Sequence, residues 1–291
     1  MSKKVVIIGK LGRIFRIIDQ VKNLLPIDKS VWAKYDLLRT LVRRDLEARY
    51  KGSVLGNLWP LLNQLSQLLI YTYVFSIVLK VKLTLKTLPD NNFTFGLWLF
   101  AGLIPWIAFT GGLMQSSNSV IGQPNLVKKV VFPLALLPLV PILSTLIESS
   151  FGLMALIFFV ALTSHTIHPT LALLPLIWLT QLLLTSGLGY LTAGLTVFLR
   201  DIPQSLGVIL NIWMYLTPIM YPTSAIPEKW RNLVFWFNPM TSIVEVYRDL
   251  VIVGKVQHWQ EWGFTFIVSS VIFYLGFSLY QRLRPAFADV L

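Results

Sequence analysis

The sequence has no cysteine, and only 13% of its 291 residues are charged. Without cysteine there is no disulfide, no thiolate metal site and no thiol nucleophile. His165 and His168 form a His-x-x-His pair with no third ligand near them, so we predict no metal site. Nothing matches Gly-x-x-x-x-Gly-Lys-Ser/Thr, the loop that cradles nucleotide phosphates, and no Ser/His/Asp set is present. We therefore expect no enzyme: no catalytic residue, and no cofactor bound by this chain.

Hydrophobic residues are abundant instead. They make up 55% of the chain, where an ordinary soluble domain has about 45–50%. They also come in long uncharged blocks, and a block of about 20 residues can cross a bilayer as a helix. We predict an all-α integral membrane protein with six transmembrane helices, the fifth of them short, at residues 57–79, 94–121, 133–162, 170–199, 205–221 and 262–281.

The positive charge is concentrated before the first span. The net charge is +12, and 13 of the 25 Lys and Arg residues precede Gly52. Such a basic flank is typical of a cytoplasmic segment beside anionic lipid, and we expect no nucleic-acid partner. Residues 1–29 alternate apolar and cationic positions at helical spacing, which predicts a basic amphipathic segment on the membrane surface. A second amphipathic helix, within residues 30–56, is too charged to cross the membrane.

The orientation follows from the cations between the spans. With both termini in the cytoplasm, 18 Lys and Arg residues fall on the inner side and 7 on the outer side. The positive-inside rule therefore predicts cytoplasmic termini. This count assigns Arg248 to an outer polar stretch, residues 222–261, which we expect to form short helices at the membrane surface.

Charged residues inside spans are the first functional candidates in a membrane protein. Glu148 is the only acid that we place deep in a span, and around it are the hydroxyls of Ser144, Thr145, Ser149 and Ser150. We favour a structural role, in which these hydroxyls satisfy the carboxylate, over proton coupling. Arg200 and Asp201 end the fourth span, either as a salt-bridged helix end or as a hinge or partner contact.

Two predicted spans carry a polar stripe, in which polar side chains recur at helical spacing on one face. The stripes are Asn63, Gln67 and Tyr71 in the first span, and Gln204, Asn211 and Tyr215 in the fifth. They indicate either hydrogen bonding between helices or the lining of a path for a hydroxyl-rich cargo. Aromatic residues near them, such as Trp106, offer ring faces to sugar C–H groups, with ordinary packing as the alternative.

The loop between the second and third spans is short, basic and bracketed by Pro124 and Pro133. It lies on the cytoplasmic side of the predicted topology and is long enough for one or two helical turns. A short rigid helix there suits docking into a groove on a soluble partner. A plain basic loop is the alternative.

Four stretches make the chain resemble the ABC-2 type permeases that export O-antigen, capsule or teichoic acid chains. They are residues 49–60 (RYKGSVLGNLWP), 102–106 (GLIPW) with 125–133 (NLVKKVVFP), 198–201 (FLRD) with 217–222 (TPIMYP), and 226–230 (IPEKW) with 238–240 (NPM). Their order and spacing are similar to that family over residues 35–285.

The resemblance implies a role for each segment. Residues 57–285 would form the six-helix transmembrane domain, and residues 222–255 its extracellular re-entrant segment. Residues 30–56 resemble the cytoplasmic interface helix, whose charged residues would be Arg43, Arg44, Asp45, Glu47 and Arg49. Residues 124–132 resemble the coupling helix that docks on the ATPase, with Asn125, Leu126, Val127, Lys128 and Lys129 as its contacts.

The resemblance also implies partners. Such permeases work as homodimers in the bacterial inner membrane with two ABC ATPase subunits, which bind the ATP and Mg. The path lies between the protomers and is lined by the first and fifth spans, where the polar stripes fall. The implied pathway residues are Asn63, Gln67, Tyr71, Trp106, Asn211 and Tyr215.

The predicted function is export of a polyprenyl-pyrophosphate-linked glycan from the cytoplasmic leaflet. Arg43, Arg44 and Arg49 are candidates to attract the pyrophosphate, with the ATPase or membrane lipids as alternative contacts. Two other functions stay open: an ABC-2 permease for a drug or a simple lipid, and a membrane-embedded enzyme of glycan synthesis. A proton-coupled carrier is a third.

Overall fold

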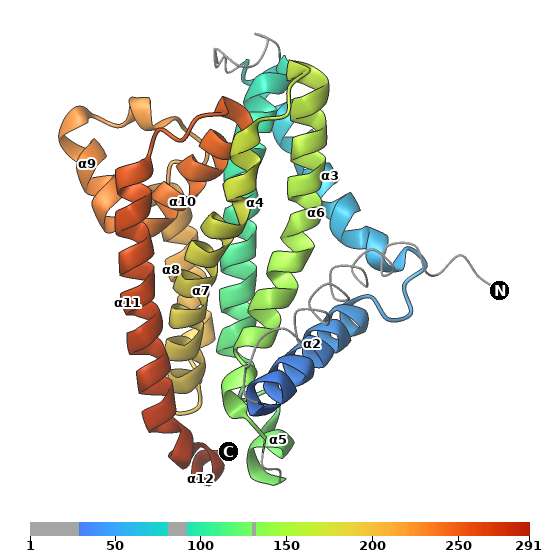
Figure 1. Cartoon of the computed structure of the whole chain (residues 1–291), viewed down its shortest axis with the longest axis vertical. Helices are drawn as coiled ribbons and strands as arrows, with labels where there is room; N and C mark the ends of the chain where they lie inside the picture. The colour runs from blue at the N-terminus through green and yellow to red at the C-terminus, as the bar shows by residue number, and fades with distance from the viewer. Residues whose placement is uncertain (1–28, 81–91, 130–131) are drawn as a thin grey trace.

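The computed structural model describes residues 29–80, 92–129 and 132–291 (Figure 1). Helices joined by short turns make up these ranges, which contain no strand. The helices are α2 (Lys29–Arg49), α3 (Trp59–Tyr71), α4 (Asn92–Ser117), α5 (Pro124–Lys129), α6 (Leu139–Ser164), α7 (Leu174–Thr196), α8 (Ile202–Leu216), α9 (Glu228–Phe237), α10 (Pro239–Arg248), α11 (Trp259–Leu283) and α12 (Phe287–Val290). The predicted surface segment at residues 1–29 lies, up to residue 28, outside the described residues.

Five helices are long and apolar enough to cross a membrane: Trp59–Val78, Phe93–Ser117, Leu134–Ser164, Pro169–Thr196 and Trp259–Val290. The first of them joins α3 to a π-helical stretch, Thr72–Val78. The fifth predicted span corresponds to α8, which has only 15 residues. At 1.5 Å per residue α8 is about 22 Å long, against about 30 Å of hydrocarbon. The chain is therefore a multi-pass membrane protein with five long spanning helices and one shorter apolar helix among the described residues.

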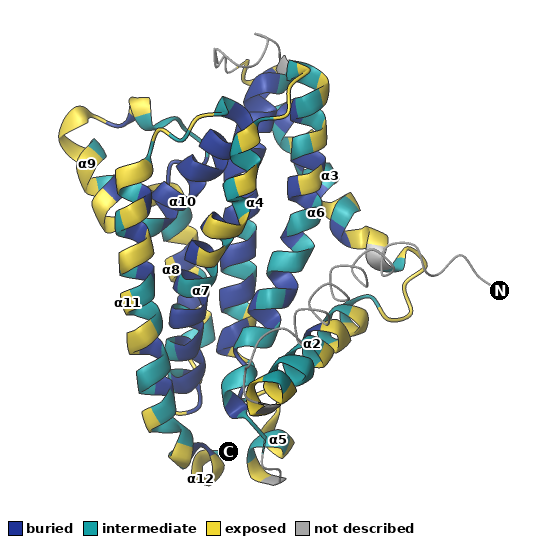
Figure 2. Ribbon diagram, in the orientation of Figure 1, coloured by how far each residue is buried: buried dark blue, intermediate teal, exposed yellow. Residues whose placement is uncertain are grey.

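Helix α4 lies at the centre of the bundle, in contact with α3, α6, α7, α8 and α10 (Figures 1 and 2). Every residue from 94 to 106 is buried. A buried chain of hydrogen bonds ties α4 to two of its neighbours: Gln181 Nε2 of α7 donates to the Pro105 carbonyl at 2.8 Å, and the Tyr247 hydroxyl of α10 donates to Gln181 Oε1 at 2.9 Å. Other helices of the bundle pack around this buried part of α4.

Helices α7 and α11 cross in close contact because both have glycine at the crossing. A Cβ atom on Gly276 would lie 2.0 Å from the carbonyl oxygen of Gly187. Small residues allow helix backbones to approach in this way. Close packing then stabilises the helix pair in lipid, where the hydrophobic effect does not drive helices together. The pair fixes α11 against the bundle.

The polar stretch 222–261 divides into two unlike helices, which partly corrects the prediction of surface helices. Helix α9 is largely exposed, as expected, whereas α10 is buried from Met240 to Arg248 (Figure 2). Burial of α10 is possible because its two charged residues, Glu245 and Arg248, pair with each other at 2.7 Å. A hydropathy profile scores each charged residue on its own and does not register the pairing, so it predicts that the helix lies at the surface.

Candidate functional site

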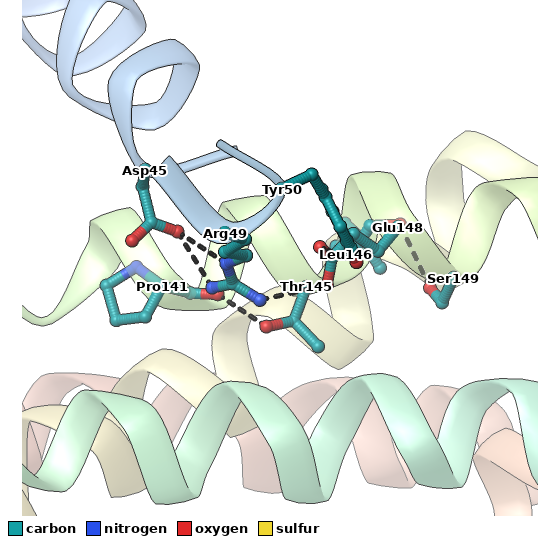
Figure 3. A network of polar contacts seen from close by, with 8 residues as sticks. All are labelled: Asp45, Arg49, Tyr50, Pro141, Thr145, Leu146, Glu148 and Ser149. Carbon is teal, nitrogen blue, oxygen red and sulfur yellow. Dashed lines mark hydrogen bonds and ion pairs between the residues drawn. The ribbon is translucent and has the colours of Figure 1, made fainter. Parts of the chain in front are cut away.

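The end of α2 is fastened to the transmembrane helix α6 by a polar network (Figure 3). Arg49, the last residue of α2, donates from Nη1 to Glu148 Oε2 at 2.9 Å and from Nε to Asp45 Oδ2 at 2.9 Å. The hydroxyl of Tyr50 donates to the other oxygen of Glu148, Oε1, at 2.8 Å. The side chains of Arg49 and Glu148 are 18% and 15% exposed. Both oxygens of one carboxylate thus hold consecutive residues at the helix end.

This network corrects the prediction that neighbouring hydroxyls satisfy Glu148. Three of those four hydroxyls donate to carbonyls of their own helix: Thr145 to Pro141, Ser149 to Leu146 and Ser150 to Ile147, at 2.7, 2.9 and 2.6 Å. Such back-bonding is the usual choice of Ser and Thr within helices. The fourth, Ser144, is buried and has no hydrogen-bond partner among the described residues. Burial, with the hydrogen bond to Glu148, raises the pKa of Tyr50, so its hydroxyl remains a donor.

The other predicted charges of α2 lie apart from this network. Arg43 and Glu47 form an exposed ion pair at 2.8 Å within α2. Arg44 is also exposed. The three arginines predicted to attract pyrophosphate are therefore divided: Arg49 binds the bundle, while Arg43 and Arg44 lie on the exposed surface of α2.

Helix α5 is the predicted short helix between α4 and α6. Its outer side chains Asn125 and Lys128 are exposed, whereas Leu126 and Val127 are half-buried. They pack on an apolar cluster from α7, α11, α12 and the adjoining turns, made of Val120, Leu134, Leu137, Tyr190, Ala193, Val197, Tyr280 and Phe287. The helix ends at Lys129, and residues 130–131 of the predicted segment 124–132 lie outside the described residues. Figure 1 shows α5, α12 and the start of α2 at one end of the bundle.

Two tyrosines hold the chain that follows α5. The Tyr190 hydroxyl donates to the Ala135 carbonyl at 2.8 Å, and the Tyr280 hydroxyl donates to the Leu134 carbonyl at 2.9 Å. The ring of Phe287 packs edge-on against Tyr280, with centroids 5.3 Å apart. Neutral, buried contacts thus position α5, unlike the ionic contacts that position the end of α2.

The residues proposed for a pathway occupy three settings. Asn63, Asn211 and Tyr215 are exposed, and Gln67 and Tyr71 are half-buried. Trp106 is buried at 4% exposure and meets Trp213 of α8 edge-on, with centroids 6.4 Å apart. Helix α3 packs on α6 and α4, and α8 packs on α4 and α7. Within one chain the two stripes therefore face outward from different sides of α4.

A neighbouring face of α3, continued by the π-helical stretch, carries polar residues that pack on other helices. Gln64 and Thr72 are buried against glycines, and neither Gln64 Oε1 nor Thr72 Oγ1 has a hydrogen-bond partner among the described residues. A Cβ atom on Gly152 of α6 would lie 2.9 Å from Gln64 Oε1, and one on Gly96 of α4 would collide with Thr72. This face therefore joins α3 to its neighbours, whereas Asn63 is exposed.

Arg200 and Asp201, at the turn before α8, do not form the salt bridge that was one interpretation. Both are exposed, and neither has an ion pair among the described residues. A hinge or a partner contact remains the prediction for them.

Arg248, predicted to lie in a polar stretch at the membrane surface, is instead buried within the bundle. It is 1% exposed and donates to the carbonyls of Pro218 and Ile219 at 2.8 Å each, besides pairing with Glu245. Its guanidinium lies over the Trp98 ring, 3.5 Å from the centroid. Glu245, on the same ten-residue helix α10, is buried too. The Glu-x-x-Arg spacing places both residues on one helix face, and this feature of the sequence could have predicted the ion pair.

A histidine near the start of α11 is held by an acid. His258 Nδ1 lies 2.9 Å from Asp249 Oδ2, and the His258 ring stacks on Phe235 of α9. Burial lowers the pKa of His258, but the hydrogen bond and charge of Asp249, with Glu245 and Glu261, outweigh this effect and raise it overall. The described residues contain no group of three or more potential metal ligands.

Comparison with known proteins gives consistent relatives. The ABC-2 type transporter family matches residues 36–252. The chain is 31% identical over 269 residues to the O-antigen export system permease protein RfbA of Myxococcus xanthus, covering 91% of this chain and 99% of the relative. It is 29% identical over 260 residues to the protein of that name in Klebsiella pneumoniae, covering 88% and 95%. The polysialic acid transport protein KpsM of Escherichia coli is 25% identical over 251 residues, covering 86% and 94%.

Proposed function

The chain belongs to the ABC-2 type transporter family, and we propose that it is the permease subunit of an exporter that moves a lipid-linked polysaccharide out of the bacterial cytoplasm. The observation that carries the proposal is the similarity, over nearly the whole length of both chains, to permeases named for O-antigen export and polysialic acid transport. These names favour a polysaccharide over a drug or a simple lipid. They also favour a transport subunit over an enzyme of glycan synthesis.

ATP hydrolysis belongs to a separate ABC ATPase subunit in this proposal. The sequence has no phosphate-binding loop, so ATP and Mg would bind the partner. Helices α2 and α5 suit contact with it, because both begin at one end of the bundle and show exposed polar residues such as Arg44, Asn125 and Lys128. This end would face the cytoplasm, with both chain termini on that side and the chain in the inner membrane.

The pathway would lie between two copies of the chain. Asn63 of α3 and Asn211 and Tyr215 of α8 are exposed among apolar neighbours. An exposed polar residue in lipid is unfavourable, whereas one that faces a hydrated path is satisfied. A second copy would bring the two stripes opposite each other around that path. Trp106 then supports Trp213 from behind.

Export can be tested in cells that lack their own O-antigen permease but still make the lipid-linked glycan. We expect surface polysaccharide when this chain is expressed with an ABC ATPase subunit of its own exporter. The matched control is the same ATPase with its phosphate-loop lysine replaced by alanine, which should give none. Assembly of both proteins in the membrane without any surface polysaccharide would contradict the proposal.

The path can be tested separately, because the chain has no native cysteine. Single cysteines at Asn63, Gln67, Tyr71, Asn211 and Tyr215 should react with a water-soluble thiol reagent in the assembled complex. A cysteine at Ile267, an apolar residue of α11 that is 62% exposed, should stay protected in lipid. Protection of all five positions, with and without ATP, would assign the stripes to helix packing.

A further inference from the structure

Among the described residues, α2 is attached to the transmembrane helices mainly at α6. Its chief packing partner is α6. The covalent connection to α3 runs through residues 51–55, all exposed, and contains Gly52 at φ +82°. Gly56 follows at φ +49°, and neither glycine would meet any atom with an added Cβ. Because this connection makes few contacts, a push on α2 reaches the bundle mainly through its contact with α6.

The polar part of the contact with α6 is made by a single carboxylate. Glu148 accepts from Arg49 and from Tyr50, one residue on each oxygen, while Asp45 holds Arg49 from the α2 side. Both charged side chains are mostly buried. An ion pair in this setting is directional, and loss of either member leaves the other charge poorly compensated. The contact therefore resists displacement of α2 relative to α6.

The same face of α6 leads on to α3. Gly152 follows Glu148 by four residues and so lies one helical turn further along that face. There it packs on Gln64 of α3, whose outward face carries the proposed pathway stripe. A displacement of α2 would thus move Glu148 and α6 with it, and α6 would in turn move α3, the helix beside the proposed path.

We propose that Arg49, Tyr50 and Glu148 form a mechanical link through which movement of α2, driven by the ATPase, reaches the transmembrane helices. They act as positioning residues and make no contact with the glycan in this role. The inference rests on the proposed function and adds to it the route by which ATP hydrolysis is coupled to the path.

The test is a comparison of coupling in four complexes: wild type, Arg49→Gln, Glu148→Gln and the double variant. Each is assembled with the ATPase, and glycan exported per ATP hydrolysed is measured. We expect each single variant to bind the ATPase and hydrolyse ATP, with export per ATP at least ten-fold lower. The double variant should be no worse than either single variant, because the three residues act as one unit. Lys51→Glu, an exposed charge change two residues from Arg49, should behave as wild type.

A variant in which a covalent cross-link replaces the ion pair distinguishes a loss of coupling from a loss of protein stability. The variant with Arg49→Cys and Glu148→Cys should be uncoupled, and a short bis-maleimide that joins the two cysteines should restore export per ATP. Single variants that export normally, or cross-linked protein that stays uncoupled, would overturn the link. If wild type itself exports nothing with its ATPase, the proposed function fails instead, which is a distinct result.

Discussion

Two arginines show how the same side chain serves different purposes in two regions of the molecule. Arg248 is almost fully buried, and three of its contacts are fixed: two backbone carbonyls and the ring of Trp98. The Arg49 side chain is 18% exposed, and its partners are side-chain carboxylates on two different helices. A partner at a partly exposed position is exchanged at a lower cost than the fully buried partners of Arg248. The first arginine therefore maintains the fold, and the second is suited to transmit movement.

The largest expected effect is loss of Arg248. Arg248→Met leaves Glu245 charged and buried without its partner, and uncompensated buried charges destabilise proteins by about 3–5 kcal/mol. We expect little monodisperse protein after detergent extraction and a markedly lower melting temperature. The matched control, Lys255→Met, removes an exposed cation seven residues further along the chain and should behave as wild type. Normal stability of the Arg248 variant would show that burial of α10 does not depend on this pair.

A second test removes one of the neutral contacts that position α5. Tyr280→Phe removes the hydrogen bond to the Leu134 carbonyl and should lower the stability of the purified chain by about 1 kcal/mol. Tyr274→Phe, at a position of the same helix that is 70% exposed, serves as the control. Binding of the ATPase should weaken only in the first variant, because α5 loses its support. Equal binding of the ATPase by both variants would show that α5 does not need the Tyr280 hydrogen bond as support.

The comparison also shows what sequence could and could not provide. Composition and uncharged blocks predicted the long spans, the shorter α8 and the charged helix α2, because these depend on local residue content. The partner of Glu148 lies 99 residues away in sequence. Arg248 was misplaced because its burial depends on the carbonyls of Pro218 and Ile219, which only the tertiary fold brings beneath it. Charges satisfied by distant groups are invisible to a local hydropathy profile.

The smallest expected effect concerns His258, which is held by Asp249 and faces Glu245 and Glu261 as well. Because these acids raise its pKa in the folded chain, protonated His258 adds stability that is fully present below its ordinary pKa of about 6.5. That contribution is lost as the pH rises through the raised folded value. We therefore expect the melting temperature of His258→Gln to fall further below wild type at pH 5.5 than at pH 8.5. A difference independent of pH would assign the effect to stacking on Phe235 alone.

The most direct test of the whole account uses the purified chain, reconstituted with its ATPase in liposomes that carry a labelled lipid-linked glycan. With ATP supplied to the ATPase side, the account predicts that labelled glycan accumulates in the lumen, where an added glycosidase cannot digest it. No accumulation should occur without ATP, or with this chain alone, which should hydrolyse none. Steady ATP hydrolysis by the complex with no protected glycan, or hydrolysis by the chain alone, would contradict the account.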